Sequence, residues 1–121
     1  MLKVKNKNVE SRPGRNSASW FGMAVELARL SRMTPRQIAD DLLARGCKGR
    51  VMSAGSCPLA QRLRQILRPG KSVPCRLCVC CMDCYVLMGA PLRVSYSFDN
   101  PQSVQDFVAA VDDGLYPDLA D

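Results

Sequence analysis

The spacing of apolar residues changes near Ser72, and this change limits the fold more than any other feature of the chain. Before it, apolar residues recur three and four positions apart, as in helices that face a core. After it, residues 73–88 form a nearly continuous apolar run and residues 92–98 alternate apolar with polar, which is typical of strands. A helical pattern returns after residue 100. This order predicts an α+β fold with three N-terminal helices, a small antiparallel sheet and one C-terminal helix.

The predicted helices have recognisable ends. The first is expected over residues 19–32. Thr34 is the predicted N-cap of the second, with Pro35 in its first helical position, because a threonine oxygen can accept a free backbone N–H and proline needs none. The third is predicted to start at Ser56, and Asn100 is the predicted N-cap of the last. Glycine follows the second, third and last helices, as helix ends favour.

A chain of 121 residues fits a single domain. We expect a flexible basic arm over residues 1–16 and one α+β domain over residues 17–121. No apolar run approaches the roughly 20 residues that span a bilayer, and the first 15 residues have no apolar signal region. Seven cysteines, an odd number, argue against a disulfide framework. We therefore expect a cytoplasmic protein that does not contact membranes.

The chain contains no histidine. Catalytic triads, Cys-His pairs, His-ligated zinc hydrolases and Cys₂His₂ fingers all require imidazole and are thereby excluded. The sequence also has neither a phosphate-binding P-loop nor a glycine-rich dinucleotide motif. We do not expect an enzyme.

Charge is unevenly distributed along the chain. Residues 1–70 hold fourteen of the seventeen Lys and Arg residues but only four of the eleven acidic ones. Such polarity suits a phosphate backbone or an acidic protein, although a solvated surface would have the same composition. The predicted nucleic-acid contacts are Lys3, Lys5, Lys7, Arg12, Arg15, Lys48, Arg50, Arg62, Arg64 and Arg68.

Residues 28–46 resemble the first two helices of a helix-turn-helix unit. That motif needs a recognition helix after another tight turn, whereas here about ten residues of glycine-containing loop intervene. Specific reading of DNA is therefore less favoured than phosphate contact by the arm.

Four cysteines recur at x₂ spacing and form the candidate metal site. Such thiolates can bind zinc, but the middle pair is too close in sequence for two knuckles to wrap one ion. Three of them could also hold an iron–sulfur cluster, with Cys47 or Cys57 as the fourth ligand. In a buried strand, successive cysteines at this spacing would instead point to opposite faces of the sheet. The four cysteines are Cys75, Cys78, Cys81 and Cys84. We favour buried thiols without a cofactor over a zinc site, and a zinc site over an iron–sulfur cluster or a redox-active pair.

Short motifs in the last two-thirds of the chain resemble a group of small, uncharacterised actinobacterial proteins. They are Gly46-x-x-Gly49, Cys57-Pro58-Leu59-Ala60 and Asp113-Gly114-Leu115-Tyr116-Pro117. The resemblance implies a compact α+β domain of unknown role and transfers no catalytic residue. The cysteine cluster and the basic arm depart from that group.

These observations leave three functional hypotheses. The first is a non-enzymatic regulatory or accessory module that binds nucleic acid or an acidic partner through the basic N-terminal half. The second is a zinc or iron–sulfur domain with a structural or redox role. The third is a protein–protein adaptor that uses the acidic C-terminal helix. Nothing in the sequence indicates an oligomeric state.

Overall fold

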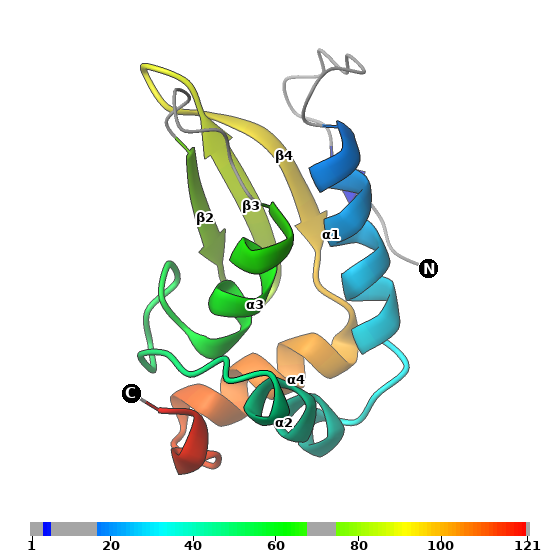
Figure 1. Ribbon diagram of the computed structural model, residues 1–121, viewed down its shortest axis with the longest axis vertical. Helices are drawn as coiled ribbons and strands as arrows, with labels where there is room; N and C mark the ends of the chain where they lie inside the picture. The colour runs from blue at the N-terminus through cyan, green and yellow to red at the C-terminus, as the bar shows by residue number, and fades with distance from the viewer. Residues whose placement is uncertain (1–3, 6–16, 68–74, 121) are drawn as a thin grey trace.

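The computed structural model describes residues 4–5, 17–67 and 75–120 and confirms the predicted α+β fold. Three helices precede the three longer strands of a small antiparallel sheet and a last helix follows them, while a two-residue strand of the same sheet comes before the helices (Figure 1). The elements are β1 (Val4–Lys5), α1 (Ser17–Leu30), α2 (Pro35–Ala44), α3 (Pro58–Leu67), β2 (Cys75–Val79), β3 (Asp83–Met88), β4 (Arg93–Asp99), α4 (Gln102–Asp112) and the 3₁₀ turn η1 (Pro117–Leu119).

The sheet has the order β1-β4-β3-β2, and every neighbouring pair is antiparallel. The long apolar run is therefore a hairpin of two strands, β2 and β3, with β2 at the edge. A bulge between Val86 and Leu87 shifts the register against β4. The residues that face the helices lie opposite one another in two rows, Val79–Cys84–Phe98 and Leu77–Val86–Tyr96.

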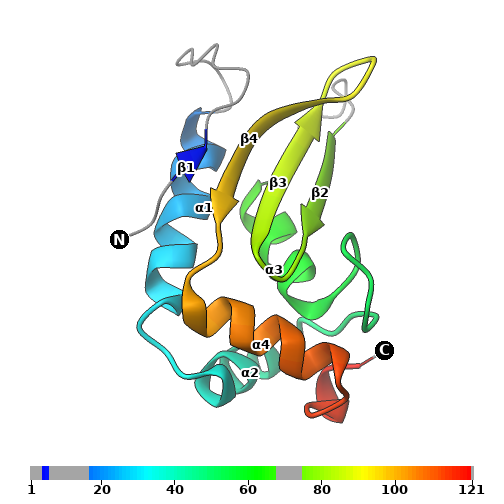
Figure 2. The same cartoon turned by 180° about the vertical axis from the view of Figure 1, so that it is seen from behind.

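Helices α1 and α3 cover one face of the sheet, and Figure 2 shows the other face from behind. The ring of Trp20 on α1 lies 6.2 Å from that of Phe98 on β4, which places α1 over β4. Gly22 lets α1 approach α3, because a Cβ there would lie 2.9 Å from Cγ2 of Ile66. The helices therefore bury their apolar stripes against the sheet and each other.

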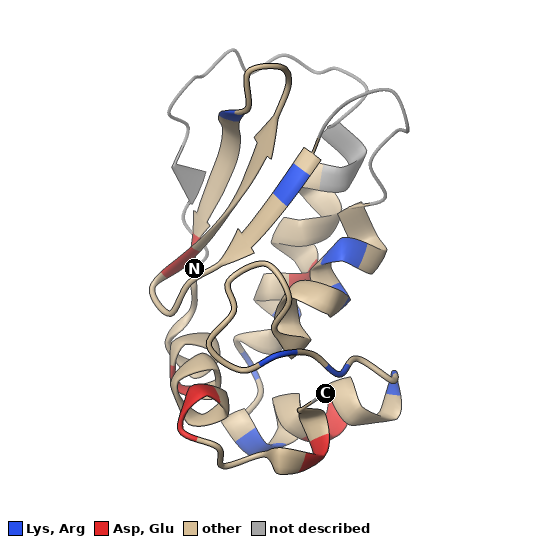
Figure 3. Cartoon of the chain, turned by 90° about the vertical axis from the view of Figure 1, so that its left-hand side faces the viewer, with Lys and Arg blue, Asp and Glu red and all other residues tan. Residues whose placement is uncertain are grey.

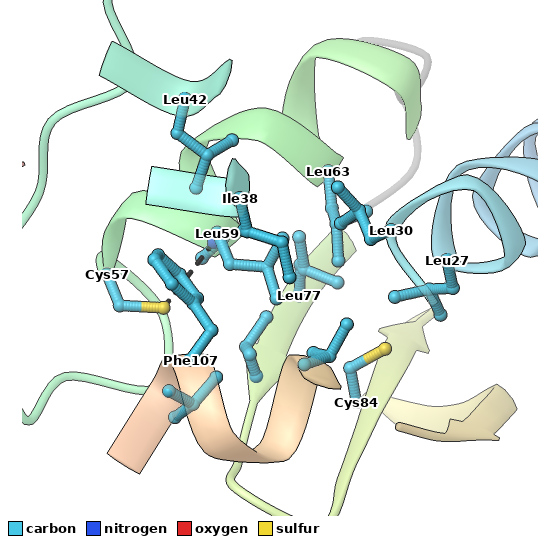
Figure 4. Close-up of a cluster of buried hydrophobic side chains, with 14 of the residues drawn as sticks. Leu27, Leu30, Ile38, Leu42, Cys57, Leu59, Leu63, Leu77, Cys84 and Phe107 are labelled. Atoms are coloured by element: carbon cyan, nitrogen blue, oxygen red, sulfur yellow. Dashed lines mark hydrogen bonds between the residues drawn. The ribbon is translucent and has the colours of Figure 1, made fainter. Parts of the chain in front are cut away.

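Helices α2 and α4 pack together at one end of the sheet, with η1 beside them (Figure 1). Phe107 of α4 stacks on Tyr116 with ring centroids 5.8 Å apart. The core is continuous between this end and the sheet: Leu77 and Cys84 from the strands meet leucines of α1 and α3 and Phe107 (Figure 4). One hydrophobic core thus holds the described elements together.

Two helix starts follow the sequence signals, one in full and one in part. The Thr34 side chain accepts the backbone N–H of Gln37, whose side chain in turn accepts the N–H of Thr34, a complete capping box. Helix α3 begins at Pro58 rather than at Ser56. The sulfur of Cys57 accepts the backbone N–H of Ala60 at 3.4 Å, so a cysteine occupies the capping position (Figure 4).

The prediction that Asn100 caps the last helix is wrong. Helix α4 has Pro101 at its N-cap position and no side-chain cap. Asn100 is buried, and its amide nitrogen donates to the carbonyl oxygens of Cys80 and Cys81 at 2.8 and 3.1 Å. Its side chain therefore fastens the β2–β3 turn to the start of α4 instead of serving the helix.

Within the predicted arm, Val4 and Lys5 pair with Phe98 and Ser97 of β4 as strand β1. The other predicted nucleic-acid contacts of the arm lie outside the described residues, and so does Arg68. The flexible arm therefore stays a prediction. Among the helices that are described, none is long and apolar enough to cross a membrane.

Candidate nucleic-acid interface

Carboxylates of the chain neutralise several arginines of the helical half. Glu26 is 5% exposed and accepts hydrogen bonds from Arg29 (3.0 and 2.7 Å) and Arg62 (3.1 Å). Arg29 also donates to Asp41, which accepts from Arg45 as well. The structure therefore directs Arg62 inward, and this predicted contact residue is absent from the surface described below.

Electrostatics keep this network ionised at neutral pH. Burial alone would raise the pKa of Glu26, but hydrogen bonds from Arg29 and Arg62 outweigh it and lower that pKa below its ordinary value. The hydrogen bond from Arg29 likewise lowers the pKa of Asp41. Because these side chains come from α1, α2 and α3, the network joins all three helices. Sequence spacing indicates the neighbours within one helix but not the contact between Glu26 and Arg62.

Four cations on adjacent elements remain exposed, and we call them the basic surface: Lys48, Arg50, Arg64 and Arg76. Lys48 and Arg50 lie in the α2–α3 loop (residues 45–57), Arg64 on α3 and Arg76 on β2. In the described part of the chain, no carboxylate forms an ion pair with any of them. Arg76 was not predicted, because a single arginine in an apolar run carries no signal of its own.

Backbone contacts hold the elements of the basic surface together. A guanidinium nitrogen of Arg64 donates to the carbonyl oxygen of Gly55 in the α2–α3 loop. The same loop accepts the N–H of Val79 through Ala54 at 2.7 Å, which covers part of the β2 edge. Arg64 also partly offsets the rise in the pKa of Cys75 that burial causes, so it lies near the start of β2. Figure 3 shows Lys and Arg positions on β2, α3 and this loop in one view of the molecule. Arg76 alternates with the buried Leu77, so its side chain leaves the edge strand on the face away from α3.

Acidic residues lie beside the basic surface, near the C-terminus of the chain (Figure 3). Asp112 accepts the backbone N–H of Met52 at 2.8 Å, and Asp113 and Asp118 are exposed nearby in sequence. The positive region is therefore bounded on one side, and a polyanion that covers Arg64 and Arg76 would run away from these carboxylates.

The strands distribute the predicted metal ligands over different faces. Cys75 and Cys84 lie on β2 and β3, Cys78 is opposite Tyr85, and Cys81 is exposed in the hairpin turn. Burial raises the pKa of the fully buried Cys84 thiol to about 12. In the described ranges, no three His, Cys, Asp or Glu side chains gather as a metal site. The structure thus does not bring the four x₂-spaced cysteines together.

The two cysteines more distant in sequence, Cys47 and Cys57, are buried in the same core as Cys84. Cys47 follows α2, and Cys57 caps α3. Burial raises the pKa of both thiols. A role for either as the fourth ligand of a cluster stays a prediction.

A separate groove of about 810 Å³, with apolar and charged side chains in its lining, lies between α1 and α2. Beside it, Phe21 and Val25 of α1 are 63% and 50% exposed. With Ala28, they recur at helical spacing on the side of α1 opposite the core, a signal that could have been read from the sequence. The groove is lined by Val25, Ala28, Arg29, Arg32, Met33, Gln37 and Asp41.

Comparison with known proteins returns no match: no family model, no curated protein and no solved structure is similar to this chain. The resemblance to small actinobacterial proteins therefore stays a prediction.

Proposed function

We propose that this protein is a non-enzymatic accessory module that binds nucleic acid through the basic surface. The observation that carries the proposal is the contrast between two groups of cations. Arg29, Arg45 and Arg62 are paired with carboxylates, whereas the four cations of the basic surface are exposed without an acidic partner among the described residues. Exposed guanidinium and ammonium groups that no carboxylate neutralises are what a phosphate backbone requires.

The magnitude can be worked from the number of cations. Each neutralised phosphate contributes a slope of about −0.9 to the dependence of log K on log salt for duplex DNA, so four contacts give about −3.6. Raising salt from about 50 to about 200 mM should then weaken binding roughly 100-fold. Cations of residues 1–15 would steepen this slope.

The test is fluorescence anisotropy of a labelled oligonucleotide, single-stranded and duplex, at several salt concentrations. Arg50→Gln, Arg64→Gln and Arg76→Gln should each weaken binding and reduce the slope by about one. Arg36→Gln is the matched control, because Arg36 is an exposed helical arginine that already pairs with Asp40 at 3.6 Å. Equal effects of all four substitutions, or no binding at low salt, would contradict the proposal.

The groove between α1 and α2 favours a second candidate, a protein–protein adaptor. Its apolar side chains with charged residues around them match the anatomy of protein interfaces. Pull-down after nuclease treatment, with Val25→Ser as the comparison variant, tests it, because Val25 lines the groove and is exposed. Capture that survives nuclease and is lost in the variant would support the adaptor.

A further inference from the structure

The tip of the α2–α3 loop holds an apolar side chain in water. Met52 is 78% exposed and Val51 is 42% exposed, so neither contributes much to the core. Met52 also has a φ of 55°, a conformation that β-carbon-bearing residues adopt infrequently. Its side chain therefore stabilises the isolated fold very little for its size.

Hydrogen bonds to η1 and α4, and one across the loop itself, hold the loop in place. The backbone N–H of Gly49 donates to the Leu119 carbonyl oxygen at 2.9 Å, and the backbone N–H of Arg50 donates to the Ser56 carbonyl oxygen at 2.9 Å. At the tip, the Met52 N–H donates to Asp112 on α4 at 2.8 Å. These contacts fix the direction in which Met52 projects, which lowers the entropic cost of placing it against a partner.

Two cations lie next to this apolar tip. Lys48 and Arg50 lie within the four residues before Met52 and are exposed. A rigid loop with an apolar point beside positive charge has the chemistry of the side-chain wedges that enter between stacked bases while cations contact the phosphates. Methionine suits this position because it is unbranched and polarizable.

We propose that Met52 inserts between neighbouring bases of a bound nucleic acid, with Lys48 and Arg50 on the adjoining phosphates. This inference rests on the proposed function and names the ligand class: nucleic acid with a step that unstacks readily, such as pyrimidine–purine steps or single strands.

An anionic membrane is the competing partner for a basic loop with an apolar tip. A flat surface that reached Met52 and the 64% exposed Leu115 would also meet the exposed carboxylates of Asp113 and Asp118. A narrow strand with Met52 inserted would pass the Asp112 carboxylate, which accepts the Met52 N–H, and could then follow Arg50 and Arg64 away from the other two. The charge distribution therefore favours nucleic acid.

The experiment uses the full chain and an oligonucleotide that carries 2-aminopurine at a central pyrimidine–purine step, because unstacking raises the fluorescence of this base. We expect binding of the wild type to raise the fluorescence. Met52→Ala should remove most of that rise and weaken binding about tenfold, with an unchanged salt slope. Arg50→Gln should lower the slope but keep the fluorescence rise at saturation.

Met82→Ala is the matched control, since Met82 is 64% exposed in the β2–β3 turn, where residues 80–83 include no Lys or Arg. It should behave as the wild type. Salt-dependent binding in which Met52→Ala leaves the fluorescence unchanged would overturn the wedge and leave the proposed function standing. Absence of binding at low salt would overturn both. Met52-dependent sedimentation with anionic vesicles, without oligonucleotide binding, would assign the loop to a lipid surface and overturn the wedge.

Discussion

Replacing Glu26 with glutamine should destabilise the protein strongly. The carboxylate is 5% exposed and accepts from two arginines, of which Arg62 has a side chain only 16% exposed. Glutamine keeps the shape but removes the charge, so Arg62 keeps its positive charge without a carboxylate. Breaking a buried ion pair in this way costs about 3–5 kcal/mol. Because Arg29 retains its ion pair with Asp41, we expect Glu26→Gln to lower the free energy of unfolding by about 3 kcal/mol, near the lower end of this range.

The assay is chemical denaturation followed by circular dichroism, together with thermal melting. For a domain of this size, a loss of about 3 kcal/mol corresponds to a fall in Tm of roughly 10 °C. The matched control is Asp40→Asn, which breaks the exposed Arg36–Asp40 pair and should change stability by less than about 0.5 kcal/mol. A Glu26→Gln variant within about 0.5 kcal/mol of the wild type would refute the account of the network.

Glu26, together with Asp41, also makes the stability of the protein depend on pH. The pKa values of Glu26 and Asp41 are lowered in the folded state, so the stability they supply is complete above their unfolded pKa values of about 4. It is lost as pH falls through the lower folded values. Wild-type Tm should therefore drop below about pH 4, and Glu26→Gln should show a flatter acid limb. Parallel acid limbs would contradict this reasoning.

Three further substitutions or modifications test other parts of the structure. Gly49→Ala should lower Tm by several degrees in thermal melting, because the new Cβ would collide with the Ser56 carbonyl oxygen, whereas an unchanged Tm would show that the loop can shift. A thiol reagent such as Ellman's should modify the exposed Cys81 within seconds and the buried Cys84 only on unfolding, as mass spectrometry of partially labelled protein would show; early labelling of Cys84 would contradict its burial. Asn100→Ala should cost about 1–3 kcal/mol in denaturant titration, since two carbonyl oxygens lose their donor, and a loss below about 0.5 kcal/mol would count against the turn contact.

The elements of the fold were predictable because their signals are local. Thr34 with Pro35 and the alternation over residues 92–98 report structure within a few positions, and both predictions are confirmed. Asn100 shows the limit of such signals. An asparagine before a helix favours capping, but its side chain reaches backbone carbonyl oxygens twenty residues away instead.

The candidate site was less predictable because it depends on which residues become partners. Charge counting treats Arg62 and Arg64 alike, yet one turns toward Glu26 on α1 and the other toward the α2–α3 loop and solvent. That difference arises only when α1 and α3 pack. The fixed direction of Met52 likewise depends on Asp112, sixty residues later in the chain.

The most direct test of the basic surface is chemical-shift mapping of ¹⁵N-labelled protein titrated with a short oligonucleotide at low salt. The proposal predicts that the largest amide shifts fall in the α2–α3 loop and around Arg64 and Arg76, and that these shifts fade as salt rises. Shifts confined to the groove between α1 and α2, or no shifts at all at low salt, would contradict it.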